Sequence, residues 1–560
     1  MPRKDGPFTF NHGHVSKVWD VMLHNKFYII YALIFSALEI SLGLFVINWG
    51  HLPSVFLFVV LSVLFLGSSY GLAREVIALL SPYRPPNKIK TVPAGRKVAL
   101  IYTTMNDVVP ECLQAIRQTY PCDVFVLDDS SNEASRKTVD SISAKMGFTV
   151  VRRNSRRGFK AGAINDWLRA YPGYDYIVLL DADSYIPQDW VEETLKYAEH
   201  PDFKDVAVFQ GMINIWNLDT NFVRTLASMS RVGQFVWEQQ LANKLDAVFC
   251  YGHNAMIRVE ALKENRGFVE GYVSEDFATS VALAEKGWKT RFVPLHTYEA
   301  MPENIRGFIR RQNKWTKGSM EFFGFCRSRI SRKKKVHLIQ IPLGHITNLL
   351  LPVGMLLTVY GFSSTPSMAA SFLKHLLANP LSTYWSVAIF RFMTVVGVLT
   401  AALSTAVRMA CGIRYVDAFR HKWLSASIRA VSIPYEFRSI LAYFSGRIKN
   451  IPVTPKNEAP LSGRDVLRIS SWSIVIELLL ITGLIRQNPL GALYNAIWLV
   501  PMAISPLIIM KFSGISSYTN SAAIGNHHAL SPTSLFPDPV VVNTLLHDTA
   551  GSTSVLETAD

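Results

Sequence analysis

The stretch YIVLLDAD at residues 176–183 decides the fold, because it reads as a buried strand that ends in two aspartates. VALIYTT (98–104) and DVFVLDD (123–129) have the same form, with short β-rich apolar runs bounded by polar or turn residues. Between these strands, apolar residues recur at the spacing of a helix, at 108–119 and 160–170. Alternating strands and helices predict a doubly wound α/β sheet, in which ligands bind just beyond the carboxyl ends of the strands.

Carboxylates stand at those strand ends. Asp128 and Asp129 close one strand, and Asp181 and Asp183 close another. Two acidic pairs on one sheet edge repel each other unless a cation intervenes, and Mg²⁺ or Mn²⁺ prefers such oxygen ligands. A lone Asp-x-Asp is more often a turn that ends a strand. Both pairs together predict binding of a divalent metal or a nucleotide.

Two further segments carry groups suited to group transfer. RRGFKAGAIN (156–165) is a basic loop that opens a helix, where Lys160 and the helix amino end suit a diphosphate. YVSEDFA (272–278) places Glu275 beside Asp276, and one of these carboxylates can take a proton from an attacking hydroxyl. Taken alone, the first segment is as readily a cationic turn, and the second a solvated acidic turn.

FIRRQNKWTKGS (308–319) combines an aromatic residue with cations on a predicted interfacial helix. Trp315 can stack on a sugar ring, while Arg311 and Lys314 can face phosphate. The alternative is a tryptophan held at a membrane surface, where this residue type is enriched.

Six apolar stretches are long enough to cross a bilayer, which takes roughly 20 helical residues. They lie near residues 27–48, 54–72, 338–360, 384–407, 469–485 and 491–510. Lys and Arg collect on one side of them, which predicts a multi-pass protein of the plasma (inner) membrane with both termini and the large middle segment in the cytoplasm. The same flanks account for the net charge of +15, and no nucleic-acid-binding pattern is visible, so no nucleic-acid partner is predicted.

These features divide the chain into seven segments. A cytoplasmic segment with two transmembrane helices (1–80) and a linker (81–97) precede a cytoplasmic α/β domain with an interfacial helix (98–325). A basic segment with two transmembrane helices (326–411), an interfacial helix with a loop (412–465), two transmembrane helices (466–511) and a disordered cytoplasmic tail (512–560) follow.

The order of the motifs resembles that of the family-2 membrane glycosyltransferases, in particular the cellulose-synthase-like proteins. That order is Asp-Asp, Lys-Ala-Gly with a following Asn165, Asp-Ala-Asp, Ser-Glu-Asp and a tryptophan-centred basic motif. IPVTPK (451–456) resembles the gating loop of that group. The resemblance covers roughly residues 50–511 and implies a nucleotide-sugar-binding domain of the GT-A type, with a Rossmann-like sheet, inserted in a helical membrane bundle.

Carried over position by position, the resemblance implies a role for each motif residue. The nucleotide and its metal would meet Asp129, Asp183, Lys160, Thr454 and Lys456, with Asp181 assisting at the metal. Asp276 would be the catalytic base, and Trp315, Glu275, His253, Arg311 and Lys314 would lie on the acceptor side.

Three departures from the family pattern bear on the product more than on the reaction class, one of them being Ile451 where the gating loop usually has Phe. Lys314 stands where the tryptophan motif has arginine, which loses a planar fork suited to diphosphate. Tyr-Gly-His-Asn (251–254) resembles a variant in bacterial glucan-synthesis relatives, in which His253 either contacts the acceptor or packs.

The sequence therefore predicts an inverting enzyme that transfers a sugar from a UDP-sugar, with UDP-glucose favoured, to a growing β-linked glycan that it extrudes across the lipid bilayer. A non-processive transferase acting on a membrane lipid or oligosaccharide is the alternative. An inactive exporter or scaffold is a third hypothesis, which intact Asp183, Asp276 and Trp315 oppose. The sequence leaves open a homo-oligomer or an export partner.

Overall fold

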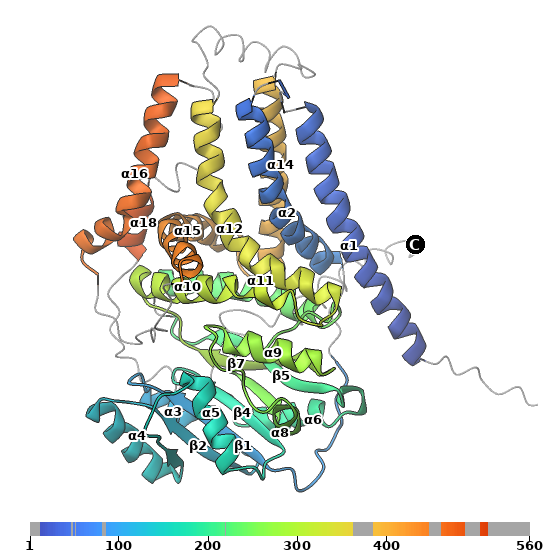
Figure 1. The fold of residues 1–560 in the computed structure, drawn as a ribbon, viewed down its shortest axis with the longest axis vertical. Helices are drawn as coiled ribbons and strands as arrows, with labels where there is room; N and C mark the ends of the chain where they lie inside the picture. Colours follow the sequence, from blue (N-terminus) through green and yellow to red (C-terminus); the bar gives the residue numbers. More distant parts are fainter. Residues whose placement is uncertain are drawn as a thin grey trace, which may run out of the picture.

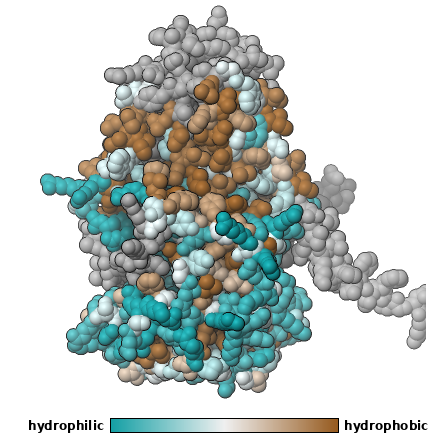
Figure 2. Space-filling view, viewed as in Figure 1, coloured by the Kyte–Doolittle hydropathy of each residue, from teal (hydrophilic) through white to brown (hydrophobic). Residues whose placement is uncertain are grey.

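The computed structural model describes residues 12–45, 47, 49–50, 52–80, 86–218, 220–361, 385–446, 461–487 and 504–512. An α/β domain lies below a group of upright helices (Figure 1). Hydrophobic residues cover the upright helices, whereas hydrophilic residues dominate the surface of the α/β domain (Figure 2). The molecule thus has an apolar end and a polar end, as the uneven charge of the sequence suggests.

A seven-stranded sheet of order β3-β2-β1-β4-β6-β5-β7 forms the centre of the α/β domain. The strands are β1 (Val98–Thr104), β2 (Cys122–Asp128), β3 (Thr149–Val151), β4 (Tyr176–Asp181), β5 (Val206–Ile215), β6 (Ala255–Arg258) and β7 (Lys289–Glu299). The β3-β2-β1-β4 half is parallel throughout, and β5 and β7 are parallel to each other. Only β6 runs against its two neighbours, β4 and β5.

The predicted α/β sheet is therefore present and the strands predicted for it are parallel to one another, although the sheet as a whole is mixed. The three predicted strands are β1, β2 and β4. The short strand β6 has no long apolar run to mark it, and its reversed direction comes from tertiary pairing rather than from a local pattern. In the parallel half, β1 pairs with β2 and β4 so that Thr104 lies opposite Asp128 and Thr103 opposite Asp181. Both acidic strand ends thus share one edge.

Helices cover both faces of this sheet (Figure 1). They are α3 (Pro110–Ala115), α4 (Glu133–Met146), α5 (Phe159–Ala170), α6 (Trp190–Ala198), α8 (Val259–Glu264) and α9 (Glu275–Glu285), with a 3₁₀ turn η1 (Pro201–Phe203). Side chains of β1 alternate between two buried clusters, with Leu100 and Tyr102 on one face and Ala99 and Ile101 on the other. This alternation is the period of a strand buried on both sides.

A second set of helices connects the sheet to the upright group: α7 (Asn221–Gly233), the π-helix η2 (Gln234–Ala242), α10 (Ile305–Met320) and α11 (Phe322–Phe325). The helix α15 (Tyr415–Phe444) packs on α7, α10 and α12 near the base of the upright helices, close to the interfacial helix expected at 412–446 (Figure 1). The upright helices are α1 (His12–Phe45), α2 (Leu52–Leu80), α12 (Arg332–Gly361), α14 (Trp385–Ala410) and α16 (Gly463–Gln487), and the short α18 (Ser505–Phe512) lies beside α15 and α16.

Among the described residues, four helical segments rather than six are long and apolar enough to cross a membrane. They are Lys26–Leu44, Val55–Leu80, Arg332–Gly354 and Gly463–Gly483. The span expected at 384–407 falls on α14, whose side chains the structure describes only from residue 395 onward, over the apolar segment Val395–Ala410. Most of the sixth expected span, 491–510, lies outside the described residues, as do the loop at 451–456 and the tail from 513.

Candidate active site

The two aspartates of the Asp-Ala-Asp motif lie where β4 ends and the chain turns. The side chain of Trp216 fixes this turn, since its indole Nε1 donates to the carbonyl of Asp183 at 2.9 Å. Asp183 is 5% exposed, and Asp181 forms an ion pair with Lys160. Burial alone would lower the pKa of Lys160, but the Asp181 carboxylate outweighs burial and the pKa is raised. Lys160 is therefore held as a cation at this edge.

Gly252 connects this cation to the predicted base. Lys160 Nζ donates to the carbonyl of Gly252 at 2.8 Å. The α-carbon of Gly252 in turn lies against Asp276, the second residue of α9, and the amide of Phe277 donates to Asp276 Oδ1 at 2.8 Å. Burial, and then the neighbouring Glu275 carboxylate, raise the pKa of Asp276 to about 7. A carboxylate with a pKa near neutrality is suited to take up a proton during a reaction.

The turn at 251–254 is held by a buried side chain, Gln210 on β5. Its Oε1 accepts from the amide of Tyr251 at 2.9 Å, and its Nε2 donates to the carbonyls of His253 and Asn254, both at 3.0 Å. Three hydrogen bonds from one fully buried amide fix the turn before β6 begins. This clamp sets the position of the His253 ring.

His253 lies between two carboxylates. Its Nε2 is 2.6 Å from Glu299 Oε2, its Nδ1 is 2.9 Å from the carbonyl of Tyr251, and Nδ1 is 3.9 Å from Asp181 Oδ2. Burial works against protonation of the ring, but Asp181 and Glu299 outweigh it and raise the pKa of His253 to about 9. The predicted acceptor-side histidine is thus a cation that faces Asp181.

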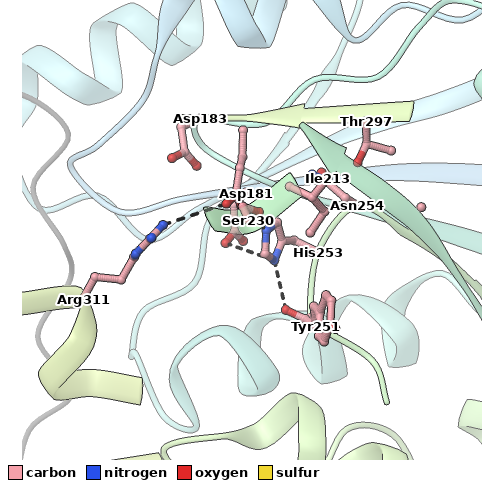
Figure 3. Close-up of polar contacts among 12 residues, drawn as sticks. Asp181, Asp183, Ile213, Ser230, Tyr251, His253, Asn254, Thr297 and Arg311 are labelled. Atoms are coloured by element: carbon pink, nitrogen blue, oxygen red, sulfur yellow. Dashed lines mark hydrogen bonds and ion pairs between the residues drawn. The ribbon is translucent and has the colours of Figure 1, made fainter. Parts of the chain in front are cut away.

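Helix α10 brings three predicted residues to the same region. Arg311 reaches from this helix toward the group formed by Asp181 and His253 (Figure 3). Its guanidinium lies 4.5 Å from the ring centroid of Trp315, and its Nη1 is 3.9 Å from Glu299 Oε1. Burial lowers the pKa of Arg311, and its Nε has no hydrogen-bond partner among the described residues. Trp315 is 51% exposed, which leaves one side of its indole open.

Lys314 lies close enough to Asp276 for its charge to oppose the rise in the pKa of that carboxyl. The site therefore brings together Asp181, Asp183, Lys160, His253, Glu275, Asp276, Arg311, Lys314 and Trp315 at one end of the sheet. Thr454 and Lys456 lie outside the described residues, so the structure does not place them.

Asp128 and Asp129 are neutralised by arginines that follow β3. Arg153 binds Asp129 through two contacts, Nε to Oδ1 at 2.8 Å and Nη2 to Oδ2 at 2.6 Å. Arg152 Nε donates to Asp128 Oδ2 at 2.8 Å. The repulsion expected between the two acidic pairs is thus relieved at the first pair by the protein itself. Asp129 keeps its place beside the strand edge where a nucleotide is predicted to bind.

A divalent metal fits this edge only together with further ligands. Asp181 and Asp183 offer hard oxygen donors of the kind that Mg²⁺ and Mn²⁺ prefer. Within the part of the chain that the structure describes, no three His, Cys, Asp or Glu side chains group as a metal site. An ion held here would therefore complete its ligand set with diphosphate oxygens and water.

Sequence reasoning missed three residues of this site: Glu299, Arg153 and Gln210. Glu299 ends β7, a strand that the apolar pattern did not reveal. An acidic residue at a strand end was the signal that found Asp181, and it applies to Glu299 once β7 is known. The contacts of Arg153 and Gln210 depend on tertiary placement and left no local signal.

Residues 176–404 match the model described as glycosyl transferase family group 2. This range begins at β4 and takes in Asp181, Asp183, Asp276 and Trp315. The match supports a glycosyltransferase with a GT-A-like α/β domain, built here on a mixed sheet.

Curated relatives share part of the chain. Glucomannan 4-beta-mannosyltransferase 1 of Oryza sativa subsp. japonica is 26% identical over 224 residues, covering 38% of this chain and 42% of the relative. Glucomannan 4-beta-mannosyltransferase 7 of Arabidopsis thaliana is 28% identical over 224 residues, covering 38% and 40%. The chain thus spans about two fifths of the length of these relatives.

Among solved structures, the mannosyltransferase PcManGT from Pyrobaculum calidifontis, in complex with GDP-Man and Mn²⁺, is similar at a TM-score of 0.43 and 20% identity. The similarity covers 62% of this chain and 98% of that one.

Proposed function

We propose that this protein is a membrane-embedded inverting glycosyltransferase that transfers a hexose from a nucleoside diphosphate sugar to a β-linked glycan and extrudes the product. The observation that carries the proposal is the position of Asp276. This carboxylate, whose pKa is raised to about 7, lies against Gly252, whose carbonyl binds the Lys160 that pairs with Asp181. The proposed base Asp276 therefore lies next to the end of β4, where Lys160 pairs with Asp181.

On the donor side, the cations balance the charge of a diphosphate. Lys160 and Arg311 approach the Asp181 edge from α5 and α10. A divalent metal held by Asp181 and Asp183 would neutralise charge on the leaving nucleoside diphosphate. Asp129, Thr454 and Lys456 stay predicted nucleotide contacts, and the loop at 451–456 is predicted to close over the donor.

On the acceptor side, Asp276 takes the proton of the attacking hydroxyl. The oxygen then attacks the anomeric carbon from the face opposite the diphosphate, which inverts the configuration there and gives a β-linkage. The exposed face of Trp315 supports an acceptor sugar by stacking, a contact that apolar sugar faces make with aromatic rings. Lys314 and Glu275 border the same space as Asp276.

A cavity of about 690 Å³ between α2, α12 and α15 supports extrusion of the product. Tyr251 and Phe277, the sequence neighbours of Gly252 and Asp276, line it, as do Tyr70, Trp237 and His345. Aromatic rings mixed with polar side chains at membrane depth suit a hydrated polymer better than lipid. The cavity therefore favours a growing glycan over a single transfer to a lipid.

The donor sugar stays open between two candidates. The sequence resemblance favoured UDP-glucose, whereas the names of the similar plant proteins point to mannose. The purified protein in lipid nanodiscs, given UDP-glucose and GDP-mannose in turn, tests both through nucleoside diphosphate release and linkage analysis of the product. We expect one donor to give a long β-linked polymer, with loss of activity in EDTA and recovery on adding Mg²⁺ or Mn²⁺.

Three outcomes would count against parts of the proposal. A short lipid-linked product would favour the non-processive alternative. Full activity in EDTA would show that the transfer needs no divalent metal. No diphosphate release from any nucleotide sugar would contradict the enzyme itself and favour the inactive exporter or scaffold.

A further inference from the structure

The amino end of α9 lacks the usual capping box. Its N-cap residue is Ser274, whose side chain makes no capping hydrogen bond. In a capping box, a Glu or Gln at the third helical position accepts from the backbone amide of the N-cap residue. Phe277 occupies that position in α9 and has no side-chain acceptor. The amide of Ser274 therefore needs an acceptor from outside the helix.

Glu321 supplies this acceptor from the end of another helix. Its Oε2 accepts from the amide of Ser274 at 3.0 Å, and its Oε1 accepts from the amide of Val273 at 2.9 Å. Both carboxylate oxygens are thus used on two consecutive amides, which fixes direction as well as distance. Glu321 is itself the C-cap residue of α10, and its own amide donates to the carbonyls of Gly318 and Ser319.

Two further contacts hold the same two segments together. Gly318 lies so close to Ser274 that a Cβ at Gly318 would collide with the Ser274 hydroxyl. The ring of Phe322, which follows Glu321, packs on the ring of Phe277 with the centroids 4.6 Å apart. The start of α9 is therefore docked on the end of α10 by a close backbone approach, by charge-assisted hydrogen bonds and by an aromatic contact.

This docking connects the proposed base to the proposed acceptor contact. Asp276 follows Ser274 after a single intervening residue, and Trp315 lies on α10, the helix that Glu321 ends. A shift of the Ser274 backbone would therefore change where Asp276 stands relative to Trp315. A general base must lie within hydrogen-bond reach of the proton that it takes, so the rate of transfer depends on this placement.

We propose that Glu321 is a positioning residue for the transfer: it anchors the backbone of Val273 and Ser274 to α10 and so sets the place of Asp276 relative to Trp315. The inference rests on the proposed function for the roles of Asp276 and Trp315. Glu321 acts through the backbone that precedes the base rather than on the substrate. A glutamine in its place keeps the size of the side chain but turns an NH₂ group toward one of the two amides, so only one of them keeps its acceptor.

The kinetics of Glu321→Gln test this role. The full-length protein in nanodiscs with Mn²⁺, given UDP-glucose or GDP-mannose, is assayed as wild type, E321Q, D276N and the double variant. We expect E321Q to lower kcat about 10–100-fold, the effect of a misplacement near 1 Å, while the donor KM changes less than about twofold. In the D276N background, where the base is already lost, E321Q should lower the residual rate less than about twofold.

Hydrogen exchange measures the anchor without turnover. We expect the amides of Val273 and Ser274 to exchange about tenfold faster in E321Q than in wild type, because a hydrogen bond to a charged acceptor is lost. E285Q is the matched control: Glu285, the last residue of α9, also accepts from a backbone amide, that of Arg329 at 2.7 Å. This control should keep the wild-type kcat and the wild-type exchange at 273–274, and thermal unfolding checks that each variant is folded.

The outcomes separate this inference from the proposed function. Wild-type kcat in E321Q, or an equal loss of rate in the wild-type and D276N backgrounds, would overturn the positioning role. Unchanged exchange at 273–274 in E321Q would overturn it as well. If the wild type transfers no sugar from any donor, the proposed function fails, and the exchange measurement alone then decides whether Glu321 anchors this segment.

Discussion

The carboxylate of Asp276 lies so close to the α-carbon of Gly252 that a Cβ at Gly252 would stand 2.9 Å from Oδ2. Gly252 also has a φ of +79°, a conformation that other residues adopt only with strain. Two independent constraints therefore require glycine in the turn that carries His253. The predicted base Asp276 and the turn at 251–254 are in contact, so a change in one is expected to reach the other.

Gly252→Ala should displace Asp276 and lower the rate of transfer by at least about tenfold, on top of a backbone cost of roughly 1 kcal/mol. Sugar transfer and thermal unfolding measure the two effects separately. Gly271→Ala is the control, because Gly271 has a φ of +91° but nothing within 4 Å of its added Cβ. Equal loss of transfer in both variants would show that backbone strain alone is responsible.

Asp276→Asn keeps the shape of the side chain but removes the proton acceptor. We expect transfer to fall about 10²–10⁴-fold, the usual range for loss of a general base, while nucleotide binding persists. Initial rates and calorimetric binding on the same preparation measure both quantities. Near-normal turnover in this variant would mean that another group takes the proton.

The pH dependence follows from the raised pKa of Asp276. With a pKa of about 7 in the folded protein, the base is protonated at lower pH, so the rate should fall about tenfold per pH unit below 7. The folded state also holds this proton more tightly than the unfolded state does, whose pKa is near 3.8. Stability due to Asp276 is thus present below pH 3.8 and is lost as the pH rises through 7.

The same linkage gives a second measurement. The melting temperature of Asp276→Asn should rise relative to wild type between pH 4 and pH 7 and then stay constant. A difference independent of pH would show that the pKa of Asp276 is not raised.

Asp129→Asn should destabilise the domain, because it leaves Arg153 without its two-contact partner. Both side chains are only 12% exposed, and a lost hydrogen bond to a charged group costs about 1.5–3 kcal/mol. Chemical denaturation measures this loss. Asp140→Asn is the control, since the Asp140 side chain that pairs with Arg152 is 53% exposed and its removal should cost under about 0.5 kcal/mol. Similar losses of unfolding free energy in Asp129→Asn and Asp140→Asn would mean that shielding from water does not determine what these ion pairs contribute.

Gly344→Trp tests extrusion. Gly344 lines the cavity, and an added Cβ there meets nothing within 4 Å, so an indole would fill the cavity rather than unfold the helix. We expect shorter products with little change in nucleotide binding, measured by product sizing and calorimetry. Gly397→Trp on α14, which is equally open but does not line the cavity, should leave product length unchanged. Full-length polymer from Gly344→Trp would place the glycan's route elsewhere.

Much of the parallel half could be predicted from the sequence, because each of its main strands is a continuous apolar run. Val98–Thr104, Cys122–Asp128 and Tyr176–Asp181 have this form, and their acidic ends mark the edge of the sheet. The strands β6 and β7 could not be predicted in this way. The first is only four residues long and the second mixes polar and apolar residues, so the mixed sheet and Glu299 followed only from tertiary pairing.

The charge balance of the site was equally beyond local reasoning. From the sequence, Asp128 and Asp129 were as available to a metal as Asp181 and Asp183. In the structure, Arg152 and Arg153, which follow β3, bind them across the β2–β3 pair. Of the six predicted spans, four are confirmed as helical segments long and apolar enough to cross a membrane. The other two, 384–407 and 491–510, fall wholly or partly on residues that the structure does not describe, so they stay predictions.

The reversal of β6 has a consequence for how such an enzyme can diversify. Gln210 of β5 and Ala255 of β6 are direct partners, so the chain leaves the sheet at the end of β5 and returns beside the same strand. The intervening excursion includes α7 and the π-helix, and through them Met229 and Trp237 of the cavity wall. Because the strand pair already closes this loop, lengthening it adds little entropic penalty. The wall of the cavity can therefore change through insertion and deletion without altering the sheet edge that carries Asp181 and Asp183.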